Sequence, residues 1–294
     1  MDHSAVSTST ASAPSSAPDP CAQVKAETIR GKAFPVVDAT SLPWVDTAQM
    51  IEVDRLMIEH YGIALEQMME NAGRALALVA RDVFLGGDPR GRRVVVLAGR
   101  GGNGGGGLVG ARRLKAWGAD VQVFLTRPDA DFSGVPARQL GILRQMGVPV
   151  TIADRSAQRD PEGDAWPASP LALPQADLVL DALVGYSLRG APRGATAALI
   201  ETANALPAPV LALDVPSGLD ATTGQTHRPS IHATATLTLA LPKTGLRTRA
   251  AAGAVGDLYL ADISVPPALY AQPTLDLPVP PLFARGEVLW IEGR

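Results

Sequence analysis

Three short apolar runs in this sequence each lead into residues that can do chemistry. Asp181 follows the first run, Asp214 and Ser217 follow the second, and Lys243 follows the third. Carboxylates and amines transfer protons and pair with charged ligands, and carboxylate and hydroxyl oxygens hold hard cations. These four residues are therefore the first candidates for a functional site.

A fourth apolar run leads into the glycine-rich stretch Gly99–Gly107, in which seven of nine residues are glycine. Glycine lets the backbone approach a ligand closely, and the free N–H groups at the start of a following helix favour an anion. No Gly-Lys-Ser/Thr follows, so the stretch is not a Walker loop. It favours a site for a phosphorylated ligand, and a tight structural turn is the alternative.

Apolar, β-branched stretches alternate with amphipathic stretches of helical length, and together they predict the elements that position these residues. Strands are expected at 93–98, 121–125, 148–152, 176–183, 210–214, 234–241 and 255–262. Helices are expected at 105–117, 135–146 and 194–205. This order predicts an α/β fold, a Rossmann-like three-layer sandwich with a mostly parallel central sheet. Ligands of such sheets lie at the carboxyl ends of the strands, where the candidate residues gather.

The part of the chain before the glycine-rich stretch predicts a tail and two more helices. Residues 1–40 are rich in proline and small residues and are expected to form a disordered tail before one domain at 41–294. A helix capped by Asp46 or Thr47 is expected to run to Tyr61. A second helix, at 65–84, has apolar residues at helical spacing that are expected to face the core: Met68, Met69, Ala72, Leu76 and Val79.

Composition excludes several classes of protein. The net charge is −3, and 19% of the 294 residues are charged, which argues against nucleic acid as a partner. Cys21 is the only cysteine, so disulfides, a zinc cluster and thiol catalysis are not expected. No apolar run approaches the ~18 residues that span a bilayer, and residues 1–20 do not resemble a secretory signal. We expect a cytoplasmic protein with no membrane partner.

Five sequence blocks together resemble the NAD(P)H-hydrate epimerase family, the YjeF N-terminal type domain. The resemblance covers about residues 43 to 290. The blocks are Met68-Met-Glu-Asn-Ala-Gly-Arg74, Gly99–Gly107, Asp181–Gly190, Asp214-Val-Pro-Ser-Gly-Leu-Asp220 and Leu241-Pro-Lys-Thr-Gly-Leu246. The resemblance implies an isomerase that interconverts the R and S forms of hydrated NADH and NADPH, so that a dehydratase acting on one epimer can restore the cofactor.

The resemblance also implies a set of site residues. Asn103, Asp181 and Ser217 match the family's ligands to one potassium ion, and their oxygens suit a hard monovalent cation. Asp214 matches a substrate contact. The other implied substrate contacts are Gly102, Asn103, Gly104, Gly105, Gly106, Gly185, Tyr186, Ser187, Leu188, Arg189, Gly190 and Ala191.

The chemistry of the implied reaction suggests a role for Asp214. The hydrated ring carries a hydroxyl on a carbon bonded to nitrogen, whose lone pair can expel that hydroxyl and leave a flat iminium open to water from either face. We expect Asp214 to be the catalytic proton-transfer group; the alternative is that it only accepts hydrogen bonds from the turn at Ser217 and Gly218. Asp181 could act through the cation or in catalysis. Lys243 is expected either to neutralise a phosphate of the substrate or to pair with a surface carboxylate.

The glycine-rich stretch departs from the family pattern, Gly-x-Gly-Asn-Asn-Gly-Gly-Asp-Gly. Gly102 replaces the first Asn and Gly106 replaces the Asp. This departure supports an alternative from another class, a catalytically silent or altered-ligand YjeF-type binding or scaffold domain. A methyltransferase is a weaker third reading, because the second strand ends in Phe-Leu-Thr-Arg127 rather than in an acidic residue.

The resemblance finally implies partners. A separate ADP- or ATP-dependent NAD(P)H-hydrate dehydratase is expected in the same pathway, and a homodimer is expected through the first helices. The apolar residues that could form the dimer are Met50, Ile51, Leu56, Met57 and Ile58, although core burial is expected for most of them.

Overall fold

The computed structural model describes residue 1 and residues 33–153 and 172–293. Most of the expected tail, residues 2–32, lies outside the described residues, as does the segment 154–171. The end of the expected tail is not a tail, because Val36–Asp38 forms strand β1 and pairs with β9 (Val288–Glu292) near the other end of the chain. Pairing between segments about 250 residues apart leaves no trace in the local pattern of either.

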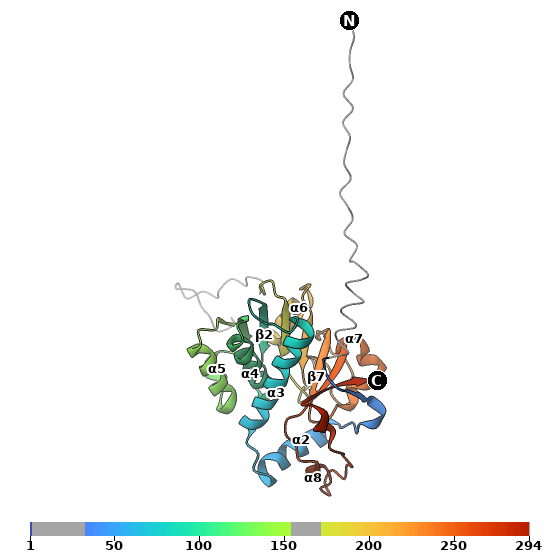
Figure 1. Ribbon diagram of the computed structural model, residues 1–294. Coiled ribbons are helices and arrows are strands. Elements are labelled where there is room, and N and C mark those ends of the chain that lie inside the picture. Colours follow the sequence, from blue (N-terminus) through green and yellow to red (C-terminus); the bar gives the residue numbers. More distant parts are fainter. Residues whose placement is uncertain (2–32, 154–171, 294) are drawn as a thin grey trace.

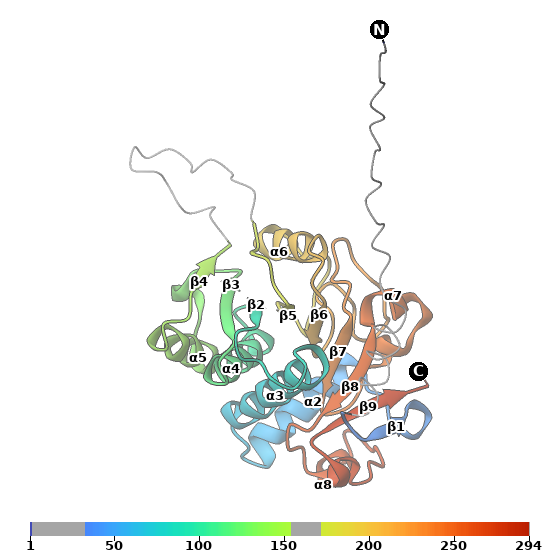
Figure 2. The same ribbon diagram turned by 45° about the horizontal axis from the view of Figure 1, so that its top comes forward.

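A nine-stranded sheet in the order β1-β9-β8-β7-β6-β5-β2-β3-β4 forms the centre of the described structure (Figures 1 and 2). All neighbouring strands are parallel except β8 and β9. The mostly parallel sheet is therefore confirmed. The remaining strands are β2 (Arg93–Ala98), β3 (Asp120–Leu125), β4 (Val150–Ile152), β5 (Leu178–Ala182), β6 (Val210–Leu213), β7 (Ala235–Leu239) and β8 (Asp257–Ala261).

Helices cover both faces of this sheet because successive strand residues point to opposite sides. Val94 and Val96 of β2 lie in the core beneath α3 (Leu65–Val79), α4 (Gly102–Ala116) and α5 (Gly134–Gln145). Val95 and Leu97 pack instead with Leu199 and Ile200 of α6 (Gly194–Asn204). The three-layer sandwich is therefore confirmed.

The glycine-rich stretch is helical for most of its length, not a loop, and α4 begins at Gly102. Its glycines let α4 lie very close to its neighbours. A Cβ added at Gly107 would lie 2.4 Å from Ala182 Cβ of β5, and one at Gly73 of α3 would lie 2.4 Å from Val109 Cβ of α4. Packing at such short range outweighs the low helix propensity of glycine, which costs about 1 kcal/mol per residue relative to alanine.

Two other helices begin and end near the expected residues. Helix α2 (Thr47–Arg55) has Asp46 as its N-cap in a capping box with Gln49, and it continues into a π-helical turn, Leu56–His60. Helix α3 likewise continues into a π-helical turn, Ala80–Phe84. All five residues of the expected apolar stripe on α3 are buried. Short helices α7 (Ala252–Val255) and α8 (Pro267–Tyr270) complete the described fold.

The chain reverses direction across the sheet between β2 and β5. From β2 it proceeds outward to β3 and β4, and then it returns to β5 on the other side of β2 and continues through β6 and β7. Such a switch point opens a crevice at the carboxyl ends of the strands. None of the helices in the described residues is long and apolar enough to cross a membrane.

Candidate functional site

The carboxyl ends of β5 and β6 meet in a buried cluster around Asp181. Ser217 donates to this carboxylate twice, from its hydroxyl to Oδ1 at 2.7 Å and from its backbone N–H to Oδ2 at 2.8 Å. The N–H of Leu183 donates to Oδ1 at 3.2 Å. Burial nevertheless raises the pKa of Asp181 to about 6, because these neutral donors only partly offset the loss of water.

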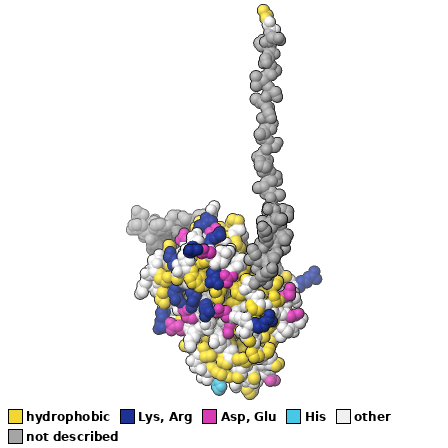
Figure 3. All heavy atoms as spheres, viewed as in Figure 1, with side chains coloured by type: hydrophobic (Ala, Val, Ile, Leu, Met, Phe, Trp, Pro, Cys, Tyr) yellow, Lys and Arg dark blue, Asp and Glu magenta, His cyan; other side chains and the backbone are white. Residues whose placement is uncertain are grey.

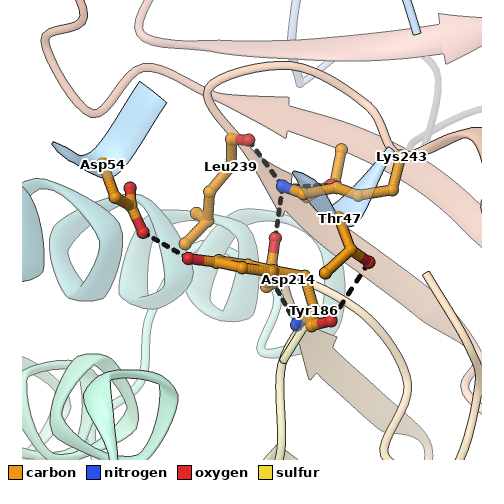
Figure 4. A network of polar contacts seen from close by, with 7 residues as sticks. Thr47, Asp54, Tyr186, Asp214, Leu239 and Lys243 are labelled. Carbon is orange, nitrogen blue, oxygen red and sulfur yellow. Dashed lines mark hydrogen bonds and ion pairs between the residues drawn. The ribbon is translucent and has the colours of Figure 1, made fainter. Parts of the chain in front are cut away.

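Asp214, at the end of β6, forms a buried ion pair with Lys243 (Figure 4). Lys243 Nζ lies 2.5 Å from Asp214 Oδ1, and the two side chains are 0% and 4% exposed. Lys243 also donates to the carbonyl of Leu239 at 2.8 Å. The lysine therefore pairs with a buried carboxylate, so the expectation of a surface carboxylate is wrong, whereas its contact with a substrate phosphate stays a prediction.

The backbone of Asp214 also marks a special position. Its φ is +69°, in the left-handed region that non-glycine residues rarely adopt. Its Oδ2 accepts a hydrogen bond from the N–H of Tyr186 at 3.0 Å. The bonds to the turn amide of Ser217 belong to Asp181 instead, so the structural alternative for Asp214 does not hold.

Tyr186 connects Asp214 to a second carboxylate. Its hydroxyl donates to Asp54 Oδ2 of α2 at 2.5 Å, while its backbone N–H binds Asp214 (Figure 4). Burial raises the pKa of Asp54, and its hydrogen bond from Tyr186 and the positive charge of Lys243 only partly oppose this. Burial and the charge of Asp54 raise the pKa of Tyr186 as well, so the phenol keeps its proton.

These groups line a cavity of about 280 Å³, here called the first cavity. Its polar wall contains Asp54, Asp214 and Lys243, together with Tyr186 and Asn103. Its apolar wall comes mainly from α2, α3 and the neighbouring strands: Met50, Leu65, Met68, Met69, Ala72, Leu213, Leu239 and Ile263. A mostly apolar cavity with a few converging polar groups is typical of a small-molecule site.

A second cavity of about 560 Å³ adjoins the first and shares Gly102, Asn103, Gly185 and Ser187 with it. All the charged side chains among its described lining residues are positive: Arg100, Arg127 and Arg193. The N-termini of α4 and α6 also open here, and neither has a side-chain cap. Free helix N–H groups and arginines both favour an anion in this cavity.

The structure brings many of the predicted site residues together. The first cavity is lined by Gly102, Asn103, Gly106, Gly185, Tyr186, Ser187, Asp214 and Lys243. Asp181 and Ser217 are fully buried behind this wall. The remaining predicted substrate contacts line neither cavity: Gly104, Gly105, Leu188, Arg189, Gly190 and Ala191.

The two departures from the family pattern differ in their surroundings. A Cβ at Gly102 would meet nothing within 4 Å, whereas one at Gly106 would lie 2.9 Å from Leu213 Cδ2. Gly102 thus leaves open space at the junction of the two cavities. A side chain at Gly106 would need Leu213 to move.

Sequence reasoning missed Asp54 and the arginines of the second cavity. Asp54 lies four residues after Met50 and three before Met57, both buried, so it interrupts the apolar face of α2. An acidic residue on a core-facing stripe was the available signal. Arg100 and Arg193 carried none, because Arg100 follows β2 and Arg193 precedes α6, and the two approach each other only because β2 pairs with β5.

The described residues contain no group of three or more His, Cys, Asp or Glu side chains that could hold a metal ion. The oxygen set at Asp181 is of another kind, with one carboxylate, the hydroxyl of Ser217 and the carbonyl of Val184, which lies 3.2 Å from that hydroxyl. Within the described structure, the amide Nδ2 of Asn103 is buried without a hydrogen-bond partner. These donors suit a hard monovalent cation rather than a transition metal.

Comparison with known proteins agrees with this architecture. The family described as "YjeF-related protein N-terminus" matches residues 65–245. The NAD(P)H-hydrate epimerase of Dehalogenimonas lykanthroporepellens is 43% identical over 239 residues, which cover 81% of this chain and 89% of that protein. The crystal structure of yeast YNL200c superposes with a TM-score of 0.64 at 26% identity, covering 85% of this chain and all of that one.

Longer relatives also match. The bifunctional NAD(P)H-hydrate repair enzyme Nnr of Moorella thermoacetica is 39% identical over 230 residues. That match covers 77% of this chain but 41% of the relative. The chain thus spans about two fifths of this bifunctional protein.

Proposed function

This chain belongs to the family of YjeF-related N-terminal domains, and we propose that it is an NAD(P)H-hydrate epimerase, an isomerase that interconverts the R and S forms of hydrated NADH and NADPH. The observation that carries the proposal is the pair of adjoining cavities at the switch point, one apolar with an acid–base set and one lined by arginines. A nicotinamide ring fits the first, and the phosphates of a dinucleotide fit the second.

Asp214 performs the proton transfer in this proposal. The ring nitrogen expels the hydroxyl from the neighbouring carbon, and water returns to the flat iminium. A carboxylate at this point stabilises the cation and accepts a proton from the incoming water, help that contributes roughly 10²–10⁴-fold to such reactions. Lys243 fixes the direction of the Asp214 carboxylate through the buried ion pair.

We further propose that Asn103, Asp181 and Ser217 hold one potassium ion. Such an ion would neutralise the buried Asp181 and fix the strand ends around the substrate. The proposal is supported by the oxygen donors at Asp181 and by the unpartnered amide of Asn103, whose oxygen would face the ion after a 180° turn. Potassium should raise the thermal midpoint more than sodium does, and Ser217→Ala should remove the difference; an equal effect of both salts would refute the site.

Partners and location follow as further proposals. A separate dehydratase would consume one epimer, and the single cysteine agrees with the cytoplasm.

A homodimer would form through α2 and its neighbours, where Ile51 and Ile58 are 55% and 45% exposed. Apolar side chains gather over α2 and α8 (Figure 3), while charges of both signs mix elsewhere on that face. Sedimentation of Ile51→Lys beside the wild type tests the dimer; equal masses would refute this surface.

A coupled assay tests the activity itself. Purified protein is mixed with both epimers of hydrated NADH and an excess of a dehydratase that accepts one of them. The proposal predicts that the second epimer disappears far faster than it does without the protein. Consumption at the uncatalysed rate would refute the function.

A further inference from the structure

Two carboxylates, not one, line the first cavity. Asp214 comes from the sheet at the end of β6, and Asp54 comes from helix α2, which packs over the site. The backbone N–H of Tyr186 bonds to one and its hydroxyl bonds to the other. The two carboxylates therefore lie at opposite ends of a single tyrosine, with Lys243 on the Asp214 side only (Figure 4).

An epimerase has a geometric need that one carboxylate does not meet. The hydroxyl leaves from one face of the ring, and water must enter at the other face to invert the carbon. Each face needs a group that gives or takes a proton within hydrogen-bond reach. The described cavity offers two such groups on two different elements.

We propose that Asp54, acting through the hydroxyl of Tyr186, is the second proton-transfer group of this site and serves the ring face opposite to Asp214. This proposal rests on the epimerase function proposed above. Beyond that function, it assigns a different carboxyl group to the protonation of each epimer.

For an epimer whose hydroxyl faces Asp214, the reaction begins with loss of that hydroxyl. The C–O bond breaks, its electron pair leaves with oxygen, and a proton held by Asp214 converts it to water. The nitrogen lone pair forms the C=N bond. A solvent water then attacks that carbon from the other face, and the C=N pair returns to nitrogen. The proton lost by this water passes to the oxygen of Tyr186 as the tyrosine proton passes to Asp54 Oδ2.

The reverse reaction runs through the same atoms in the opposite order. Asp54 gives its proton to the oxygen of Tyr186, and the tyrosine gives its own to the leaving hydroxyl. The hydrogen bond in the structure, from the tyrosine to Asp54, is the arrangement in which Asp54 is ready to accept. Burial raises the pKa of Asp54, which helps this carboxyl to hold the proton between turnovers.

Oxygen exchange with ¹⁸O-labelled water separates the two faces. Each epimer of hydrated NADH is incubated separately with the enzyme, and the label in both epimers is measured by mass spectrometry after chromatographic separation. The wild type should place label in both. Asp54→Asn should lower epimerisation at least about 100-fold. It should still exchange the hydroxyl of one epimer without inverting it. Asp214→Asn should show the opposite preference.

Two further variants complete the test. Tyr186→Phe should reproduce the one-sided exchange of Asp54→Asn, because it breaks the same relay. Glu59→Gln makes the same carboxylate-to-amide change just after α2 on a side chain that is 62% exposed, and it should behave as the wild type.

Two results would overturn the proposal. One is epimerisation by the Asp54→Asn protein at the wild-type rate, and the other is an equal loss of oxygen exchange for both epimers in a folded Asp54→Asn protein. A wild-type protein without epimerase activity would instead overturn the function on which the proposal rests.

Discussion

At the residue scale, the site depends on buried charges that are paired across long distances in the sequence. Asp214 and Lys243 form a pair with almost no exposure, 29 positions apart. Asp54 and Tyr186 are 132 positions apart. Asp181, Asp214 and Ser217 could be identified from the ends of their apolar runs. The partner of Lys243 and the role of Asp54 could not, because local sequence does not say which side chains meet.

Lys243→Met should destabilise the fold strongly. The change removes the cation and leaves the Asp214 carboxylate buried without its partner, which typically costs about 3–5 kcal/mol. Arg138→Met is the control, since it breaks an ion pair with Glu66 whose side chains are 65% and 41% exposed and should cost about 0–1 kcal/mol. Urea unfolding of both variants measures the difference, and equal midpoints would contradict the buried pair.

The stability of Asp54→Asn should depend on pH in a defined direction. Burial raises the folded-state pKa of Asp54, so the folded protein binds this proton more tightly than the unfolded chain, whose value is near 3.8. The contribution of Asp54 to the stability of the wild type therefore falls as pH rises from about 3.8 through the raised pKa of the folded state. Asp54→Asn removes this loss of stability, because asparagine does not ionise.

Thermal unfolding at pH 4 and pH 8 measures this effect. The midpoint of Asp54→Asn minus that of the wild type should be larger at pH 8 than at pH 4. The matched control is Glu59→Gln, on a side chain that is 62% exposed. A difference that shrinks as pH rises would contradict a raised pKa.

At the scale of elements, the main surprise is α4. Because glycine disfavours helices, the sequence predicted that this helix begins only at residue 105. In the structure, Gly102–Gly107 already forms its first turns. Contact with α3 and β5 overrides this local preference, since even a methyl group would collide there. Strands β2 to β8 and the other long helices were predicted nearly at their observed bounds, because their periodicity reports directly on which face is buried. Strands β1 and β9 were not predicted.

Two glycine substitutions should have opposite effects on stability. Gly107→Ala places a Cβ 2.4 Å from Ala182 Cβ and should destabilise the fold by about 1–3 kcal/mol or more. Gly141→Ala lies within α5, meets nothing within 4 Å and should stabilise the fold by about 0.5–1 kcal/mol. Denaturant unfolding of both proteins tests the pair. A neutral Gly107→Ala would show that α4 does not need this close approach.

At the scale of the whole molecule, the order of strands creates the site. The switch between β2 and β5 places the start of α4 beside the ends of β5 and β6, so that two cavities open at one edge of the sheet. The alternation of elements was enough to predict this edge and its sandwich. It was not enough to predict the pairing of β1 with β9, which joins the two ends of the described fold.

Asp214 is the residue whose chemical role matters most for the proposed epimerase activity. The direct test is to follow the interconversion of R and S hydrated NADH by chromatography with purified wild-type and Asp214→Asn protein, and to record thermal unfolding of the same samples. Asp214→Asn leaves Lys243 buried without its partner, so we predict a lower thermal midpoint than that of the wild type. We also predict that the variant is folded at the assay temperature and that its epimerisation falls by at least about 100-fold, toward the uncatalysed rate. Turnover at the wild-type rate in the folded variant would contradict the account.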